Sequence, residues 1–336
     1  MKAYVLHNVN DLRYEDVPMP DCPKGWAIVQ VKAAGICSSD VARVFTKGTY
    51  HFPTIPGHEF SGIVSTVSEK ENEYLIGKPV CVYPLIPCRE CSQCQQKHYE
   101  LCENYDYIGS RRDGAFAEYV AVPVWNLHLL PDEVPMEMAA MLEPLSVGLH
   151  ALKQVDIHCL DNLAVIGTGM IGIGAAHLAK RFVDGKVIVF GRNDNKRTLV
   201  EKMGLDYELH TNANEQGFDV VLEAVGSPSS IDLALNVVRP GGTVVLMGNP
   251  TGEVLLSQNT YWRILRKQLL IKGTWNSFYD GTNKSDWTDA IEALSSGEVK
   301  VGPLVSHLLP QTQLMEGLQL MRAHKEPYCK IMTIWN

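Results

Sequence analysis

The hydrophobic pattern changes once along the chain, at about residue 149. Before that point, short apolar stretches alternate with polar residues and with proline-rich turns, which is the pattern of an all-β segment. The clearest predicted strands cover residues 3–6, 26–31 and 115–122, and prolines at residues 17–20 separate the first two. A mostly apolar stretch at residues 138–150 then predicts a buried helix.

From about residue 149 onward, predicted strands and helices alternate, which indicates a parallel sheet with helices on both of its faces. Strands are expected at residues 163–166, 187–190, 207–210, 219–223, 243–248 and 269–273. Helices are expected at residues 194–203, 231–238 and 262–267. These six strands match the number in a doubly wound sheet, so the predicted fold class is α/β.

The C-terminal stretch carries helical patterns at residues 285–294 and 314–324 and a strand pattern at 330–334. It is too short to form a core of its own, so we expect it to pack back on the first domain. A chain of 336 residues is long enough for about two domains. The expected division is a β-domain at residues 1–148, a doubly wound domain at 149–276 and a return segment at 277–336.

A glycine-rich turn follows the first strand of the doubly wound region. Gly167, Gly169 and Gly172 have the spacing G-x-G-x-x-G, and the next strand begins at residue 187. This gives a strand–turn–helix–strand unit of about 30 residues, which is typical of a dinucleotide site with the pyrophosphate at the helix N-terminus. The predicted cofactor contacts in this turn are Gly167, Thr168, Gly169, Met170, Ile171 and Gly172.

Four of the nine cysteines lie close together in the β-domain, in the pattern Cys88-x2-Cys91-x2-Cys94-x7-Cys102. Two-residue gaps let successive sulfurs converge on one tetrahedral zinc ion. An iron–sulfur cluster is the main alternative, but the ferredoxin pattern has a three-residue last gap followed by proline. We therefore favour zinc. Four thiolates leave no open coordination position, which predicts that residues 88–102 form a structural zinc lobe.

Cys37, His58 and Glu59 supply a thiolate, an imidazole and a carboxylate, a suitable ligand set for a second zinc ion. Taken alone, a buried cysteine and a satisfied His–Glu pair are the simpler interpretation. Glu143 lies among apolar residues directly before a proline, and a carboxylate in such a place needs a partner or a metal.

The charge of the chain narrows the possible partners. The formal net charge is -8, which disfavours nucleic acid and acidic membranes. An anionic substrate would therefore need a local cationic group, and Arg111 and Arg112 are candidates. Adjacent side chains in an extended segment point to opposite sides, so at most one of them would face a ligand. The chain shows neither a long apolar run nor a signal-peptide pattern, and we expect a cytoplasmic protein.

The order of these features resembles the zinc-dependent medium-chain dehydrogenase/reductase family, whose members join a GroES-like β-barrel catalytic domain to a Rossmann domain. The segments Gly-His-Glu at 57–59 and Leu-Glu-Pro at 142–144 resemble the sorbitol dehydrogenase branch. Within that branch, residues 58–62, 107–114 and 264–267 are similar to enzymes that act on polyol phosphates such as galactitol 1-phosphate.

The resemblance implies that Cys37, His58 and a glutamate, either Glu59 or Glu143, hold the catalytic zinc. It places Ser39 where the family has the hydroxyl that relays the substrate proton. With two carboxylates beside one thiolate, a Zn²⁺ site becomes net negative. The segment that carries Arg111 and Arg112 lines the substrate pocket in this family, which makes one of them a candidate phosphate clamp.

The implied reaction is hydride transfer between NAD(P) and a secondary alcohol of a polyol or polyol phosphate. Gly191 and Arg192 stand where NAD-using members carry an acidic residue, which predicts that NADP(H) is accepted. The predicted cofactor site also includes Gly248. The alternatives are a dehydrogenase of free polyols or sugar acids and an inactive NADP(H)-binding zinc protein. Relatives pair Rossmann sheets edge to edge, so a homodimer or homotetramer joined near residues 269–275 is expected.

Overall fold

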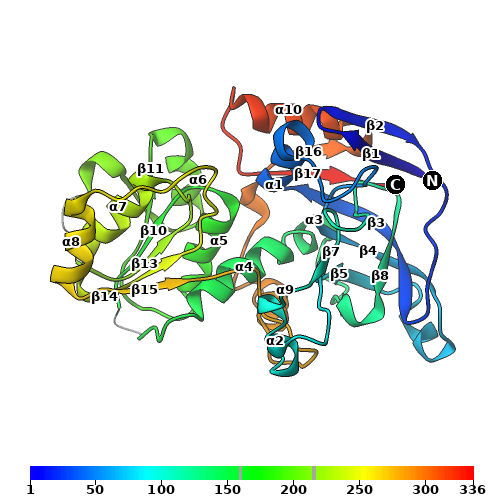
Figure 1. Cartoon of the computed structure of the whole chain (residues 1–336), viewed down its shortest axis with the longest axis horizontal. Coiled ribbons are helices and arrows are strands. Elements are labelled where there is room, and N and C mark those ends of the chain that lie inside the picture. The colour runs from blue at the N-terminus through cyan, green and yellow to red at the C-terminus, as the bar shows by residue number, and fades with distance from the viewer. Residues whose placement is uncertain (159–160, 214–216) are drawn as a thin grey trace. The chain divides into compact units, whose positions relative to one another are not determined.

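The computed structural model describes residues 1–158, 161–213 and 217–336 (Figure 1). The chain forms two compact units, one of Met1–Glu143 with Phe278–Asn336 and the other of Pro144–Ser277. The two units meet along the chain between Glu143 and Pro144, inside helix α4 (Leu142–Leu152), which also contains the expected boundary at residue 148. Among the described residues, no helix is both long and apolar enough to cross a lipid bilayer.

The first unit is built mainly from β-structure around a core of valine, isoleucine, alanine and aromatic side chains. Its main sheet has the order β16-β17-β3-β4-β5-β9, and β8 also pairs with β3. The strands are β1 (Lys2–Asn8), β2 (Asp11–Asp16), β3 (Trp26–Ile36), β4 (Glu59–Val67), β5 (Pro79–Val82), β6 (Leu85–Ile86), β7 (Asp106–Tyr107), β8 (Tyr119–Pro123), β9 (Leu127–Leu129), β16 (Val305–Pro310) and β17 (Lys330–Ile334). The helices are α1 (Ser38–Ala42), α2 (Ser92–Gln95), α3 (Met136–Ala139), α9 (Asp286–Ser295) and α10 (Leu314–Ala323).

The return segment completes the main sheet of this unit. Strand β17 pairs antiparallel with β3, which brings Met332 opposite Gly35, and Figure 1 shows the red strand beside the blue one. Strand β4 pairs with β3 from the other side and places Glu59 opposite Gly35. Two strands from the first part of the chain and one from its end therefore meet at one point of the sheet.

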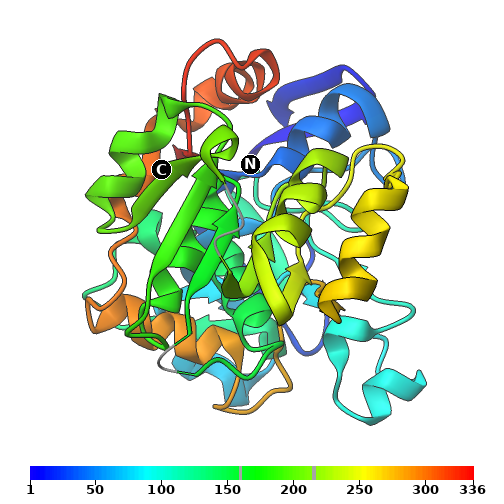
Figure 2. The same ribbon diagram turned by 90° about the vertical axis from the view of Figure 1, so that its left-hand side faces the viewer.

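The second unit is the parallel sheet that the alternating pattern predicts, and the α/β fold class is confirmed. The strands are β10 (Leu163–Ile166), β11 (Val187–Gly191), β12 (Asp206–Leu209), β13 (Phe218–Glu223), β14 (Val238–Leu246) and β15 (Leu270–Gly273), and their order is β12-β11-β10-β13-β14-β15. The helices are α5 (Met170–Ala179), α6 (Arg197–Lys202), α7 (Pro228–Val237) and α8 (Gln258–Lys267). From β10 the chain adds β11 and then β12 on one side. It then crosses to the other side of β10, where it adds β13, β14 and β15. Because both runs use right-handed crossovers, helices cover both faces of the sheet (Figure 2).

The helix expected at residues 138–150 is in fact two helices, α3 and α4, with a break at Ala140 and Met141. Pro144 explains the break. In one continuous helix its ring would collide with the carbonyl group of Ala140, whereas in the first turn of α4 its missing N–H group needs no partner. The break leaves Glu143 in the first turn of α4, at the edge of the first unit.

Candidate active site

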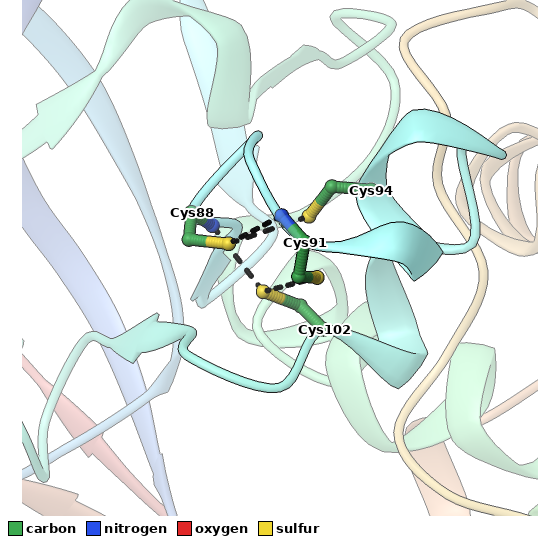
Figure 3. Close-up of side chains that lie close together, drawn as sticks. All are labelled: Cys88, Cys91, Cys94 and Cys102. Carbon is green, nitrogen blue, oxygen red and sulfur yellow. Dashed lines mark hydrogen bonds between the residues drawn. The ribbon is translucent and has the colours of Figure 1, made fainter.

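The four clustered cysteines converge as their spacing predicts (Figure 3). Their sulfur atoms all lie within 4.8 Å of one another, with 3.8 Å between Cys88 and Cys94 and 4.0 Å between Cys91 and Cys102. A tetrahedron with zinc–sulfur bonds of about 2.3 Å has edges of about 3.8 Å. The group therefore fits one zinc ion. Cys91 is the N-cap of α2, Cys94 lies within this helix and Cys102 follows the turn Tyr99–Leu101.

Backbone N–H groups surround the sulfur atoms of this lobe. The N–H group of Cys91 donates to the sulfur of Cys88 at 3.4 Å, and that of Cys88 donates to the sulfur of Cys102 at 3.3 Å. Backbone N–H donors from Glu103 and Cys94 lower the pKa of Cys91 to about 6. Zinc binds thiolates, so donors that stabilise the ionised sulfur suit a metal site.

The second group consists of Cys37, His58 and Glu59, whose ligand atoms also lie within 4.8 Å of one another. The sheet explains how they meet. Cys37 directly follows β3, and His58 directly precedes β4, whose first residue is Glu59. Because β3 and β4 are antiparallel neighbours, the end of one lies beside the start of the other. One thiolate, one imidazole and one carboxylate therefore surround a common point, which fits a second zinc ion.

Asp40 orients the histidine of this group. Its carboxylate is completely buried, with Oδ1 3.4 Å from Nδ1 of His58 and 3.0 Å from the guanidinium of Arg43. The backbone N–H group of Cys37 donates to its other oxygen at 3.0 Å. Nδ1 of His58 faces this carboxylate at ion-pair distance but makes no hydrogen bond to it, which leaves Nε2 as the nitrogen available to a metal.

Asp40 and His58 each stabilise the charged form of the other. Burial alone would lower the pKa of His58, but the Asp40 carboxylate and the Cys37 thiolate raise it well above its usual value. Burial alone would raise the pKa of Asp40, but His58 and Arg43 hold it below its usual value. Asp40 thus stays ionised. In the absence of metal a proton occupies His58, and metal binding at this site should release it.

Glu143 lies near this group but outside the set of three whose ligand atoms lie within 4.8 Å. Its carboxylate is buried and accepts a hydrogen bond from the hydroxyl of Tyr107 at 3.2 Å. The ring of Tyr107 is 5.8 Å from that of His58. Burial, reinforced by the charge of Glu59, raises the pKa of Glu143 to about 7. The sequence indicated that this carboxylate needs a partner or a metal, and the partner found in the structure is the hydroxyl of Tyr107.

Glu59 has a partner that sequence reasoning missed. Lys330, the first residue of β17, is buried, and its ammonium group forms an ion pair with Oε2 of Glu59. Burial alone would lower the pKa of Lys330, but Glu59 and Cys37 raise it above its usual value, so the side chain is charged. Asp40 had a local signal, its position three residues after Cys37, whereas Lys330 had none because it lies 271 residues from Glu59 in the sequence.

Ser39 lies in the first turn of α1, two residues after Cys37. Its hydroxyl oxygen accepts a hydrogen bond from the guanidinium of Arg43 at 2.8 Å. The same guanidinium nitrogen donates to Asp40. Arg43 therefore fixes the hydroxyl of Ser39 and the carboxylate behind His58 with a single group.

The two adjacent arginines have different surroundings. Arg112 forms an ion pair with Asp106 at 2.7 Å and stacks on the ring of Trp26. Arg111 stacks between the rings of Tyr50 and Tyr105, each 4.3 Å from its guanidinium carbon. It donates to the carbonyl oxygen of Tyr105 at 2.8 Å and to the hydroxyl of Tyr50 at 3.3 Å. Within the described parts of the chain, Arg111 has no carboxylate partner, so its charge is not neutralised as that of Arg112 is.

The glycine-rich turn has the form that a pyrophosphate requires. Gly167 has φ +121°, and a Cβ there would lie 2.8 Å from Val225. At Gly169, which caps α5, a Cβ would meet nothing within 4 Å, so the helix N-terminus opens on free space. Gly172 lies against the carbonyl oxygen of Gly167, which brings the helix close to the strand. Thr168, Met170 and Ile171 complete the turn, and N–H groups in the first turn of α5 lack helical partners.

Gly191 is the last residue of β11, which extends one residue beyond the predicted strand at 187–190. A Cβ at Gly191 would collide with the hydroxyl of Tyr207, which reaches across from β12 and donates to the carbonyl oxygen of Asn193. The neighbouring strand thus leaves no room for a side chain at residue 191. Arg192 is exposed beside it. Gly248, just beyond β14, packs against the backbone of Val225 and Gly226.

A doubly wound domain with a dinucleotide turn, joined to a β-domain with two zinc-type ligand groups, defines a zinc- and nicotinamide-dependent oxidoreductase. The family comparisons agree. Residues 23–132 match the alcohol dehydrogenase GroES-like domain, and residues 170–296 match the zinc-binding dehydrogenase domain. The chain belongs to the zinc-dependent medium-chain dehydrogenase family, and zinc and NAD(P) are its cofactors.

Two relatives and two solved structures illustrate the range of this family. The galactitol 1-phosphate 5-dehydrogenase of Escherichia coli (strain K12) is 31% identical over 83% of this chain and 84% of its own. A crystal structure of galactitol-1-phosphate dehydrogenase from Escherichia coli has a TM-score of 0.90 at 29% identity and covers 99% of this chain and 100% of that one. The sorbitol dehydrogenase of Bacillus subtilis (strain 168) is 29% identical over 100% of this chain and 98% of its own. A zinc-binding dehydrogenase from Sinorhizobium meliloti 1021 bound to NADP has a TM-score of 0.89 at 26% identity, covering 99% and 98% of the two chains.

Proposed function

We propose that this chain transfers hydride between NAD(P) and a secondary alcohol of a polyol phosphate. The observation that carries the proposal is the convergence of Cys37, His58 and Glu59, with Glu143 held nearby by Tyr107. When bound there, zinc supplies a Lewis acid that lowers the pKa of an alcohol hydroxyl. Of the residues of the chain, Cys37, His58 and Glu59 would hold the metal, and Asp40 would stay paired with His58 on the side of the ring away from it. Ser39, whose hydroxyl oxygen accepts from Arg43, would relay the alcohol proton, accepting it while its own hydroxyl proton passes on toward solvent.

Glu143 is proposed as the carboxylate that exchanges. It is not part of the tight group of three, its only hydrogen-bond donor among the described residues is a tyrosine hydroxyl, and burial has raised its pKa to about 7. With a pKa near neutral pH, this carboxylate can take up or release a proton at a small cost in free energy. It can therefore approach a metal as an anion and leave it as a neutral acid. Glu59, in contrast, is held by an ammonium group.

Arg111 is proposed as the group that binds the phosphate. It is the arginine of the pair without a carboxylate partner, and its stacking on Tyr50 and Tyr105 fixes the plane of the guanidinium. The ring of Tyr105 packs edge-to-face against that of Tyr107, with 6.1 Å between the centroids, and the tilted ring of His58 follows at 5.8 Å from Tyr107. Arg111 therefore lies two rings away from the metal group. One observation favours a free polyol instead: Arg111 already donates to a carbonyl and a hydroxyl oxygen.

We expect Arg111→Ala to raise KM for galactitol 1-phosphate roughly thirtyfold and to change KM for galactitol little, because charge-assisted hydrogen bonds to phosphate contribute about 2 kcal/mol. Arg112→Ala is the matched control, since Asp106 already neutralises Arg112. Steady-state kinetics with both substrates and both nicotinamides measure the effect. Equal effects of Arg111→Ala on the two substrates would leave the free polyol as the substrate class.

NADP(H) is proposed to be used at least as well as NAD(H). Tyr207 prevents an acidic side chain at residue 191, so the usual carboxylate partner of the ribose 2′-hydroxyl has no place. Arg192 is exposed at the same strand end and, among the described residues, has no ion-pair partner. A free guanidinium beside an unobstructed strand end suits a 2′-phosphate. The relative from Sinorhizobium meliloti was solved with NADP bound.

Arg192→Ala should lower kcat/KM for NADP about thirtyfold and leave kcat/KM for NAD almost unchanged, since only NADP carries the phosphate that the guanidinium contacts. NAD thus serves as the internal control in the same assay. A wild-type enzyme that prefers NAD a hundredfold would disprove the assignment.

A homo-oligomer is proposed to form through β15. All residues of this edge strand are exposed, including Leu270 and Ile271, and its outer side pairs with no described strand. Leu265 and Trp275 nearby are also exposed. An apolar edge of this kind favours pairing with a second copy.

Light scattering should therefore give at least twice the chain mass of 37.3 kDa for the wild type and 37.3 kDa for Ile271→Lys. The control is Ile76→Lys, which changes an equally exposed isoleucine in the first unit. A wild-type monomer at micromolar concentration would contradict pairing through β15.

The cytoplasm is the proposed location. Eight cysteines are free thiols in the structure, and the two metal groups need five of them as thiolates. Such groups persist in a reducing compartment.

A further inference from the structure

Lys330 is a buried cation that nothing in the proposed reaction uses directly. Its side chain is 4% exposed, and its ammonium group donates to Oε2 of Glu59 and, at 3.3 Å, to the carbonyl oxygen of Ile36. Burying an ammonium group is costly unless a carboxylate and further hydrogen bonds compensate. Both kinds of partner are present here: Ile36 ends β3 directly before Cys37, and Glu59 begins β4 directly after His58.

The strand between Glu59 and Lys330 makes room for their contact. Gly35 of β3 lies opposite Glu59 in one neighbouring strand and Met332 in the other. A Cβ at Gly35 would lie 2.6 Å from Oε2 of Glu59 and 3.4 Å from Cδ of Lys330. The missing side chain at residue 35 is therefore the space in which the carboxylate meets the ammonium group.

We propose that Lys330 is a positioning residue that limits how Glu59 serves the metal. The inference rests on the zinc site proposed above. By holding Oε2, Lys330 leaves Glu59 one oxygen for the metal and cancels one of the two glutamate charges. With Glu143 ionised, the charges of Zn²⁺, the Cys37 thiolate, Glu59, Glu143 and Lys330 then sum to zero. The net negative site expected from the sequence becomes a neutral one, and of the two glutamates Glu143 is the one left free to exchange.

The test compares metal release and metal geometry in Lys330→Met and the wild-type holoenzyme. A buried positive charge beside the site disfavours a cation, and its removal also frees both oxygens of Glu59. We expect zinc to leave the catalytic site about tenfold more slowly in Lys330→Met, as measured with a chromophoric chelator. The visible spectrum of the Co²⁺-substituted enzyme should also change. Lys330→Arg, which keeps the charge, should restore the wild-type spectrum, and release from the four-cysteine site should stay constant in all variants.

Gly35→Ala provides an independent test that keeps every charge in place. The added Cβ pushes the carboxylate of Glu59 away from Lys330, so the Co²⁺ spectrum should change here as well. The matched control is Gly252→Ala, where a Cβ meets nothing within 4 Å. If Lys330→Met fails to fold, Gly35→Ala decides the question alone.

Wild-type zinc release and wild-type Co²⁺ spectra in Lys330→Met and Gly35→Ala, with only a lower melting temperature, would overturn the proposal. Lys330 would then only join β17 to its neighbours. A wild-type chain that binds a single zinc ion would instead disprove the catalytic zinc site itself, so the two failures are distinguishable.

Discussion

Cys37→Ser is expected to lower kcat about a thousandfold and to reduce the zinc content from two ions per chain to one. Loss of the thiolate removes the anionic ligand that precedes α1, and Lewis-acid stabilisation is worth several kcal/mol, with about 1.4 kcal/mol for each factor of ten. Elemental analysis and steady-state kinetics on the same preparation measure both effects. Glu143→Gln should cost less, about tenfold, because this carboxylate lies outside the group of three and only exchanges.

Cys22→Ser is the matched control for Cys37→Ser, since Cys22 is a partly exposed cysteine that belongs to neither metal group. It should keep both zinc ions and full activity. If Cys37→Ser also kept two zinc ions and wild-type turnover, the catalytic site would have to lie elsewhere.

Cys94→Ser should cause the second large effect, the loss of the structural zinc and a fall in melting temperature of more than about 10 °C. Cys94 is buried, and a tetrahedral zinc ion at this site would need all four sulfur atoms as ligands. Without the metal, residues 88–102 have little apolar core of their own. Arg89, which stacks on Trp125 at 4.5 Å, would lose its position, so tryptophan fluorescence should shift to longer wavelength at a lower temperature.

The control for Cys94→Ser is Cys81→Ser. Cys81 is also buried but lies in β5 outside the metal groups, so it shows the cost of burying a serine hydroxyl without losing a metal. The difference between the two melting temperatures is the contribution of zinc. Equal melting temperatures and an unchanged zinc content would show that these cysteines hold no metal.

The net charge of the proposed catalytic zinc site is one property that the sequence alone did not predict correctly. From the sequence, two glutamates beside one thiolate make a Zn²⁺ site net negative. The structure adds Lys330, and with it the charges balance. The same applies to cofactor choice: Gly191 and Arg192 suggest NADP(H), but only the position of Tyr207 shows why residue 191 has no side chain. The two arginines looked equivalent, and only Asp106 distinguishes them.

The sequence by itself determined the features whose residues lie close together along the chain. The cysteine spacing predicted the zinc lobe, the glycine spacing predicted the dinucleotide turn, and the alternation of strands and helices predicted the parallel sheet. These signals are local because helices, turns and short metal loops are built from neighbouring residues. The pairing of β17 with β3 decided the rest, since it brings Lys330 to Glu59 across 271 residues. Strand pairing over such a distance leaves no periodic trace in the sequence, so the buried cation beside the metal group was visible only in the folded chain.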